Sequence, residues 1–229
     1  MIFLILAKIQ LITLIASLSL IVPIIIGTIN LKEVKNSPFI VLYCYLIIYA
    51  IFEIIAWYYM LHKLQNHFLG NTVIYLDIFF FGWYYYFVLS NQTQKKIILC
   101  SIFIAISIIL WSHFGTDRDY NRLDSFALSV ENITIILISL IFFYQLLNTL
   151  EVRNLFIYSH FWIATAVLFY FSVIFFLDLF AEYVAFNKDK VFAQSYWNIK
   201  EYLTFFHRIF LAIGLWFSKT PIQSNLSSK

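Results

Sequence analysis

The sequence is dominated by long apolar stretches that short polar segments separate. A membrane-spanning helix needs about 20 consecutive, mostly apolar residues, and seven stretches of this chain meet that requirement. They lie at residues 2–29, 39–61, 68–90, 97–114, 126–149, 156–181 and 195–217. We therefore predict an all-α fold in which residues 1–229 form one polytopic transmembrane bundle of seven helices.

The composition excludes an ordinary water-soluble domain. Hydrophobic residues make up 62% of the chain and charged residues only 12%, whereas soluble proteins have roughly 25% charged residues. Lipid accepts apolar side chains all around a helix, and water does not. The net charge of +3 comes without a basic run, so nucleic acid is not an expected partner. The lipid bilayer is the partner that the composition predicts.

The polar segments between the stretches predict an orientation in the membrane. Cytoplasmic loops usually carry more Lys and Arg than outer loops. If the N-terminus lies outside, the cytoplasmic side holds seven basic residues and the outer side five. The cytoplasmic set is Lys32, Lys35, Lys95, Lys96, Arg153, Lys219 and Lys229, and the outer set is Lys63, Arg118, Arg122, Lys188 and Lys190. We expect the N-terminus outside and the C-terminus inside.

Few residues interrupt the predicted helices. The chain has five glycines and three prolines, and Pro23 is the only proline inside a stretch. Transporters often build their binding sites where Gly or Pro breaks a helix. We therefore expect regular, continuous helices, a pattern that disfavours a transporter. The first stretch has no basic leader and no small-residue cleavage site, so we expect it to be retained as a helix.

Ionisable side chains inside the stretches are the main functional signal. Each one costs at least about 2.5 kcal/mol at mid-depth and therefore needs a partner, a wet cavity or a function. With the N-terminus outside, nearly all of them fall at similar depth in the outer half of the membrane. We predict an outward-facing pocket for a small-molecule ligand. The predicted lining, with polar and aromatic neighbours included, is Glu53, Trp57, Asp77, Glu131, Asn132, Glu201 and Arg208.

A second set of polar residues is predicted to support this pocket. Its members are Asp178, Glu182, Lys200, Thr204 and His207. Asp178 and Glu182 are four residues apart, which places them on one face of a continuous helix. A plainer interpretation stays open, in which both acids and Lys200 lie at the water interface. In the same interpretation, Glu53 or Asp77 forms a structural ion pair with Arg208.

Two kinds of intramembrane chemistry are alternatives. Metal hydrolases of the alkaline-ceramidase type hold a metal between several histidines and an acid, which His62, His67, His113, His207 and Asp77 would supply. The His-x-x-x-His pair that such enzymes carry on their last helix is missing, so we predict no metal site and no cofactor. A retinal protein needs a lysine in the middle of its last helix, and Lys200 lies too near the outer end. An enzyme is therefore disfavoured.

Two runs near the C-terminus carry a family resemblance. Residues 159–172 contain S-H-F-W-I and L-F-Y-F-S, and residues 209–216 are I-F-L-A-I-G-L-W. These runs, with Glu53 and the pair Glu131-Asn132, resemble a bacterial family of small seven-helix membrane proteins. Its members are suspected to accompany sensor histidine kinases. The resemblance thus implies the bacterial inner membrane and a sensor that signals to a separate partner; the alternatives are an intramembrane metal-dependent hydrolase and a structural or assembly subunit.

Overall fold

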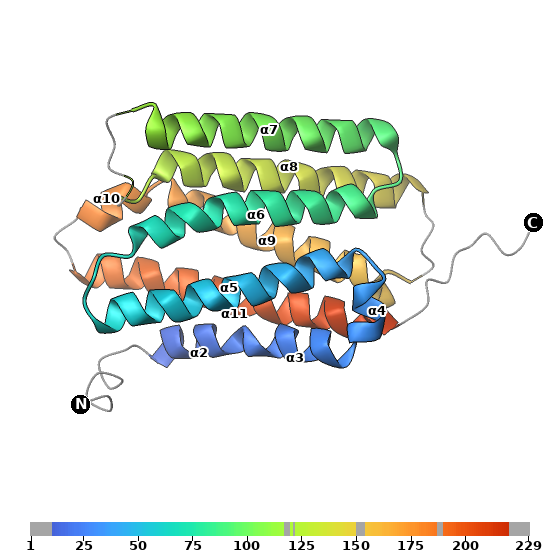
Figure 1. Cartoon of the computed structure of the whole chain (residues 1–229), viewed down its shortest axis with the longest axis horizontal. Coiled ribbons are helices and arrows are strands. Elements are labelled where there is room, and N and C mark those ends of the chain that lie inside the picture. Colours follow the sequence, from blue (N-terminus) through green and yellow to red (C-terminus); the bar gives the residue numbers. More distant parts are fainter. Residues whose placement is uncertain (1–10, 117–119, 121, 150–153, 187–189, 220–229) are drawn as a thin grey trace, which may run out of the picture.

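A computed structural model describes residues 11–116, 120, 122–149, 154–186 and 190–219. Within this part of the chain there are helices and turns but no strand, and the long helices lie side by side in one bundle (Figure 1). The helices are α2 (Leu11–Ser19), α3 (Ile21–Ile29), α4 (Leu31–Lys35), α5 (Phe39–Leu61), α6 (His67–Val88), α7 (Gln92–Phe114), α8 (Ser125–Thr149), η1 (Leu155–Ile157), α9 (Ser159–Asp178), α10 (Ala181–Phe186), α11 (Lys190–Trp216) and η2 (Phe217–Lys219).

Five helical segments are long and apolar enough to cross a membrane. They are Leu11–Ile29, which joins α2 and α3, and the helices α5, α7, α8 and α9, with mean hydropathies between 2.0 and 2.4. Helices α6 and α11 have 22 and 27 residues and lie in the same bundle, but they are not among these five segments. The described chain is therefore an all-helical membrane protein with at least five helices suited to span the bilayer.

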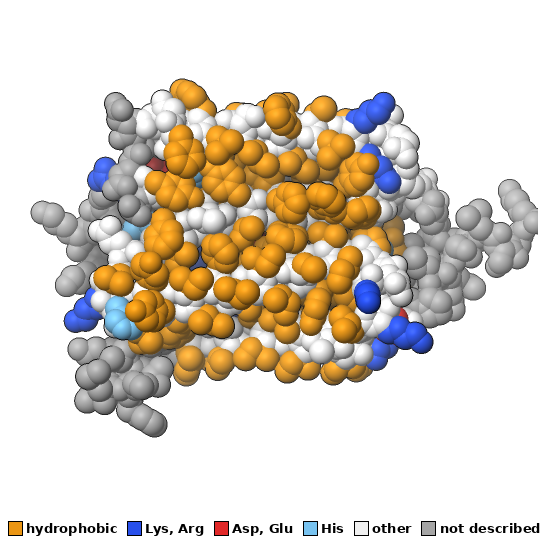
Figure 2. Space-filling model, in the orientation of Figure 1, with side chains coloured by type: hydrophobic (Ala, Val, Ile, Leu, Met, Phe, Trp, Pro, Cys, Tyr) orange, Lys and Arg blue, Asp and Glu red, His pale blue; other side chains and the backbone are white. Residues whose placement is uncertain are grey.

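The outer surface of the bundle is apolar along most of its length. Figure 2 shows hydrophobic side chains over the middle of one face, with Lys and Arg side chains gathered toward the two ends. Large apolar side chains point outward, such as Phe103 and Ile54, which are 74% and 69% exposed. Water would not stabilise such a surface, whereas lipid tails do, and the charged ends match the headgroup regions.

Helix α5 has the predicted bounds, and the other helices differ from prediction mainly at their ends. Helix α7 begins five residues earlier than predicted because Asn91 caps it, with its side-chain oxygen accepting the Thr93 N–H at 2.8 Å. Helix α11 already includes Lys190, although a loop was predicted there. Of the predicted loop residues, Asp117–Asp119, Glu151–Arg153 and 187–189 lie outside the described part, as does Lys229.

The prediction of continuous helices is wrong at two places. The first stretch, of which residues 2–10 lie outside the described part, is divided into α2 and α3 at Leu20. Pro23 explains this break, because proline has no N–H to donate to the preceding turn. The predicted helix 156–181 ends at Asp178 and is followed by the separate short α10. Asp178 and Glu182 therefore do not share a helix face.

Reciprocal hydrogen bonds hold α10 at the start of α8. The Glu182 N–H donates to the Ser125 hydroxyl at 2.9 Å, and the Ser125 N–H donates to the Glu182 carboxylate at 3.2 Å. Glu182 is thereby directed toward α8, whereas Asp178 is 2% exposed and points into the bundle.

Helix α11 lies at the centre of the packing, against α9 on one side and against α2 and α3 on another. Gly214 allows the close approach of α11 and α9. A Cβ atom at Gly214 would lie 2.5 Å from Ile163 Cγ1 and 3.2 Å from the Ser159 carbonyl oxygen. Small residues have this role at many membrane helix contacts, because they let two backbones come together.

We predict that Gly214→Ala lowers the thermal stability of the detergent-purified protein. The added methyl group overpacks the contact of α11 with α9, at a cost of about 1–3 kcal/mol. Gly70→Ala is the matched control, because a Cβ atom there would meet nothing within 4 Å. The unfolding midpoint of each variant, followed by intrinsic fluorescence on heating, measures the effect. Equal midpoints for the two variants would contradict this packing.

Candidate functional site

Two neighbouring cavities open among α5, α6, α8, α9 and α11. The outer chamber has a volume of about 270 Å³, and Asn66, His67 and Leu123 place it at the end of the bundle where α5 ends and α6 begins. The inner chamber has a volume of about 170 Å³ and is lined by Asp77 and Asn132, among others. The two chambers share five lining residues, namely Tyr49, Gly70, Val73, Leu128 and Lys200. They therefore form one hollow that runs from this end, the pocket end, into the bundle.

The walls of the inner chamber combine aromatic and polar side chains from five helices. The polar ones are Asp77 from α6, Glu131 and Asn132 from α8, Asp178 from α9 and Lys200 from α11. Asp77 is ten residues into α6, about 15 Å from the start of that helix. Ligand pockets in proteins typically combine apolar walls with a few convergent polar groups, and the inner chamber has this character.

One carboxylate of the inner chamber, Asp178, is fully neutralised. The Lys200 ammonium donates to its Oδ1 at 2.7 Å, and the Asn132 amide donates to its Oδ2 at 2.9 Å. The Tyr196 hydroxyl lies 3.5 Å from Oδ1. The ion pair joins α9 to α11, and among the described residues Lys200 is the one lysine that lines either chamber.

The other two carboxyls of the inner chamber belong to Asp77 and Glu131. Their side chains contact each other, and the Tyr45 hydroxyl contacts Asp77. Asp77 is 7% exposed and Glu131 is 4% exposed. The Oδ1 atom of Asp77 is buried and has no hydrogen-bond partner. Among the described residues, neither carboxyl forms an ion pair.

Glu53 and Arg208 form the second ion pair of the bundle interior. Arg208 Nη2 donates to Glu53 Oε2 at 2.8 Å, and its Nη1 donates to the Ala16 carbonyl oxygen. The Ser17 hydroxyl donates to Glu53 Oε1 at 2.6 Å and accepts the Trp57 indole N–H at 3.0 Å. These contacts join α2, α5 and α11. Glu53 also lines the outer chamber.

A third and much smaller cavity, of about 20 Å³, lies beyond the inner chamber. Thr204, His207 and Arg208 line it from α11, and Asp77 lines it from α6. The His207 ring stacks on Tyr170 with centroids 4.4 Å apart, and its Nε2 is buried without a partner. This cavity extends the polar interior toward the middle of the bundle.

The structure brings most of the predicted pocket residues together. Glu53, Asp77, Glu131, Asn132, Asp178 and Lys200 line the two chambers, and Thr204, His207 and Arg208 line the third cavity. Three predicted residues lie elsewhere. Trp57 contacts Ser17 of α2, Glu182 binds the start of α8, and Glu201 is half-buried beside Arg208 and Lys200 without lining a chamber.

The tyrosines of the site were not among the predicted pocket residues. Tyr45 contacts Asp77, and Tyr49 lines all three cavities. Both precede Glu53 at intervals of four residues along α5, so helical spacing from that acid points to them. Gly70 was missed as well, although it opens both chambers. No local pattern marks it, because its role depends on the neighbouring helices.

The histidines do not converge on a metal site. His113 binds the Tyr75 hydroxyl through Nδ1 at 2.8 Å, His207 stacks on Tyr170, and His62 is exposed at the end of α5. Among the described residues, no three His, Cys, Asp or Glu side chains are placed to hold a metal ion. The donor set of the metal-hydrolase alternative is therefore not assembled.

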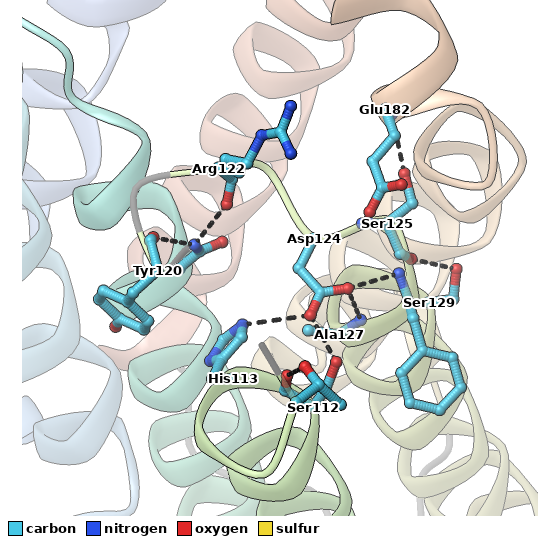
Figure 3. Close-up of polar contacts among 12 residues, drawn as sticks. Ser112, His113, Tyr120, Arg122, Asp124, Ser125, Ala127, Ser129 and Glu182 are labelled. Carbon is cyan, nitrogen blue, oxygen red and sulfur yellow. Dashed lines mark hydrogen bonds and ion pairs between the residues drawn. The ribbon is translucent and has the colours of Figure 1, made fainter. Parts of the chain in front are cut away.

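A further polar cluster at the pocket end surrounds Asp124 (Figure 3). Asp124 Oδ1 accepts the N–H groups of Phe126 and Ala127 at 3.0 and 3.1 Å, which caps the first turn of α8. Its Oδ2 accepts the Ser112 hydroxyl at 2.5 Å and lies 3.6 Å from His113 Nε2. The cluster ties the end of α7 to the start of α8.

The cluster contains a serine, a histidine and an aspartate, but it is not arranged for nucleophilic catalysis. In a catalytic triad the serine hydroxyl bonds to the histidine, which removes its proton. Here the Ser112 hydroxyl donates directly to Asp124, and His113 binds Tyr75 instead. The Asp124 cluster therefore has a structural role. The two chambers remain as the candidate functional site.

Comparisons with known proteins give no match: no family model, no curated protein and no solved structure matches this chain. The resemblance to the bacterial seven-helix family thus remains a prediction, and functional conclusions depend on the site itself.

We predict that Glu53→Gln destabilises the bundle by about 3 kcal/mol, because it leaves the buried Arg208 without its counter-charge. Adding Arg208→Met removes the unpaired charge, so the double variant should regain at least half of the lost stability. Thermal unfolding midpoints of the wild type, both single variants and the double variant in detergent measure this coupling. Additive losses would show that the two residues are not energetically paired.

Proposed function

We propose that this chain is a seven-helix membrane receptor with its N-terminus outside and its C-terminus inside. A small polar molecule enters the two chambers from the outside. Ligand binding shifts the helices. A separate membrane partner, such as a sensor histidine kinase, binds the opposite end and responds to this shift. We place the protein in the inner (plasma) membrane of a bacterium.

The observation that carries this proposal is the inner chamber. Its volume of about 170 Å³ is enough for several water-sized groups, and four different helices supply its polar residues. A bundle that had only to be stable would fill this space with apolar side chains, because unfilled volume and buried polar groups both cost stability. A ligand-binding role accounts for both.

Seven spans and this orientation fit the distribution of charge. With α2 and α3 taken as one span, and with α6 and α11 counted, seven helical segments cross the bundle. Among the described residues in the connections and at the helix ends, Lys32, Lys35, Lys95, Lys96 and Lys219 belong to the end opposite the pocket, and Lys63, Arg122 and Lys190 belong to the pocket end. An excess of basic residues favours the cytoplasmic side, so the pocket end would face outward.

Helix α11 connects the chambers with the opposite end. It carries Lys200 in the chamber wall and continues to Trp216, about 24 Å further along its axis. There the Asn30 side chain donates to the Leu215 carbonyl oxygen at 2.8 Å, which links α11 to the basic α4. A ligand that binds more tightly when Lys200 occupies one position shifts α11 toward that position. This shift changes the surface at the opposite end of α11, which a partner can contact.

Cysteine labelling in intact cells tests the orientation. In a Cys44→Ala/Cys100→Ala background, Lys63→Cys should react with a membrane-impermeant maleimide, and Lys35→Cys should react only after the cells are opened. The two positions lie at opposite ends of α5. The reverse pattern would overturn the orientation, and equal labelling of both positions in intact cells would show that α5 does not span the membrane.

A cavity-filling variant tests the receptor function. Gly70 lines both chambers and has open space where its Cβ atom would lie, so Gly70→Phe should fill the hollow without disturbing the helices. In a thermal-shift screen of small molecules with varied charge, wild type and the Gly70→Ala control should be stabilised by a ligand that leaves Gly70→Phe unchanged. The absence of any such compound would overturn the proposal.

Purification from native membranes tests the signalling step. A C-terminally tagged chain in a mild detergent should recover a membrane signalling protein in near-stoichiometric yield. Removing the positive charges of α4, with Lys32→Gln and Lys35→Gln, should reduce that yield several-fold and leave ligand-induced stabilisation intact. Recovery of the chain alone would exclude a stably bound partner and leave a self-contained binding protein.

A further inference from the structure

The charges around the chambers do not balance. Among the described residues, Lys200 and Arg208 are the Lys and Arg side chains that line the three cavities, beside His67 and His207. Lys200 and Arg208 are each paired with an acid, at 2.7 and 2.8 Å. These pairs use Asp178 and Glu53. Two further acids, Asp77 and Glu131, face the inner chamber without a basic partner. The hollow therefore has an excess of acidic groups at its inner end.

Simultaneous ionisation of Asp77 and Glu131 is energetically unfavourable, because both side chains are buried and in contact. Their side chains contact each other and are at least nine-tenths buried. Two carboxylates in contact repel strongly where little water screens them. Asp77 Oδ1 in addition lacks any hydrogen-bond donor. A proton held by one carboxyl relieves this repulsion, and so does a positive group beside the two carboxyls, for which the chamber that they line provides space.

We infer that the inner chamber binds the ammonium group of a small organic amine, with Asp77 and Glu131 as its counter-ions. The inference rests on the proposed ligand-binding function and names the chemical class of the ligand. A primary ammonium group has three hydrogen-bond donors, which suit the free Asp77 oxygen and the adjacent Glu131 carboxyl. The remainder of the molecule would extend into the outer chamber.

The lining favours an organic cation over a bare metal ion. Calcium takes six to eight oxygen ligands, whereas the described residues place no group of three His, Cys, Asp or Glu side chains suited to a metal. The walls that face the two carboxyls include Tyr170 and Phe171, and Trp197 and Phe52 line the outer chamber. Aromatic rings attract ammonium groups and also pack against the apolar body of an amine.

A matched pair of probes separates charge from shape. 2-Phenylethylamine and 2-phenylethanol have the same skeleton and differ in the ammonium and hydroxyl groups. With the purified chain in lipid nanodiscs, we expect the amine to bind at least tenfold more tightly than the alcohol, as measured by isothermal titration calorimetry at neutral pH. Phenylacetate, which carries the opposite charge, should not bind. The same series with butylamine and 1-butanol tests smaller ligands.

Isosteric variants assign the charge to the two carboxyls. Asp77→Asn and Glu131→Gln should each weaken amine binding at least tenfold and leave the affinity for the alcohol unchanged. Glu33→Gln is the matched control, because it removes the same charge from an exposed site on α4 at the opposite end. Since the probe series uses the unmodified chain, the inference can be tested even where a variant does not fold.

The outcomes distinguish the two proposals. Amine selectivity that both variants abolish supports the inference. Equal or tighter binding of the alcohols or of phenylacetate, with a loss of binding in Gly70→Phe, overturns the charge assignment but leaves the receptor function standing. If no amine binds and the broader screen finds no Gly70-dependent ligand of any charge, both proposals fail.

Discussion

The position of α11 in the bundle depends on two ion pairs, and the rest of the interior is arranged around them. Lys200 is held by Asp178 of α9, and Arg208 is held by Glu53 of α5. Separated charges are costly in a low-dielectric interior, and breaking such a pair leaves one of them unpaired. The two pairs therefore fix both the rotation of α11 and its height relative to its neighbours. They also place the hollow, because Lys200 lines both chambers and Arg208 closes the third cavity below them.

The polar groups of the interior thus form two sets. Those with hydrogen-bond or ionic partners are the satisfied part, and those without are the unsatisfied part. The satisfied part includes both ion pairs and the Asp124 cluster at the start of α8, where each strong acceptor has several donors. The unsatisfied part includes Asp77 Oδ1 beside the inner chamber and His207 Nε2 in the third cavity, which are buried without a hydrogen-bond partner. Buried polar groups are normally hydrogen-bonded, and exceptions call for an explanation. The contrast within one bundle supports a functional explanation for Asp77, because the same fold provides donors to the carboxylates of Asp178, Glu53 and Asp124.

The sequence predicted the helical class, the membrane environment and the residues of the polar interior better than it predicted their contacts. Apolar stretches of spanning length are a local property, so α5 was predicted to the residue. Helix ends depend on caps such as Asn91, and the division of the first stretch depends on Pro23, whose effect was underestimated. The pairing of Glu53 with Arg208 joins residues 155 positions apart. The sequence left Glu53 and Asp77 open as partners of Arg208, and the structure pairs Arg208 with Glu53. Spacing within one helix cannot decide between the two acids, nor can it show that Trp57 turns toward Ser17.

The ion pairs of α11 also bear on the order in which the bundle can be completed. Lys200 and Arg208 lie in α11, which follows α5 and α9 in the sequence. Their counter-charges, Glu53 and Asp178, are on those two earlier helices. A buried charge that loses its partner is strongly destabilising. A chain that ended before Lys190 would therefore lack the bases that neutralise Glu53 and Asp178, so docking of α11 is the step that completes the interior.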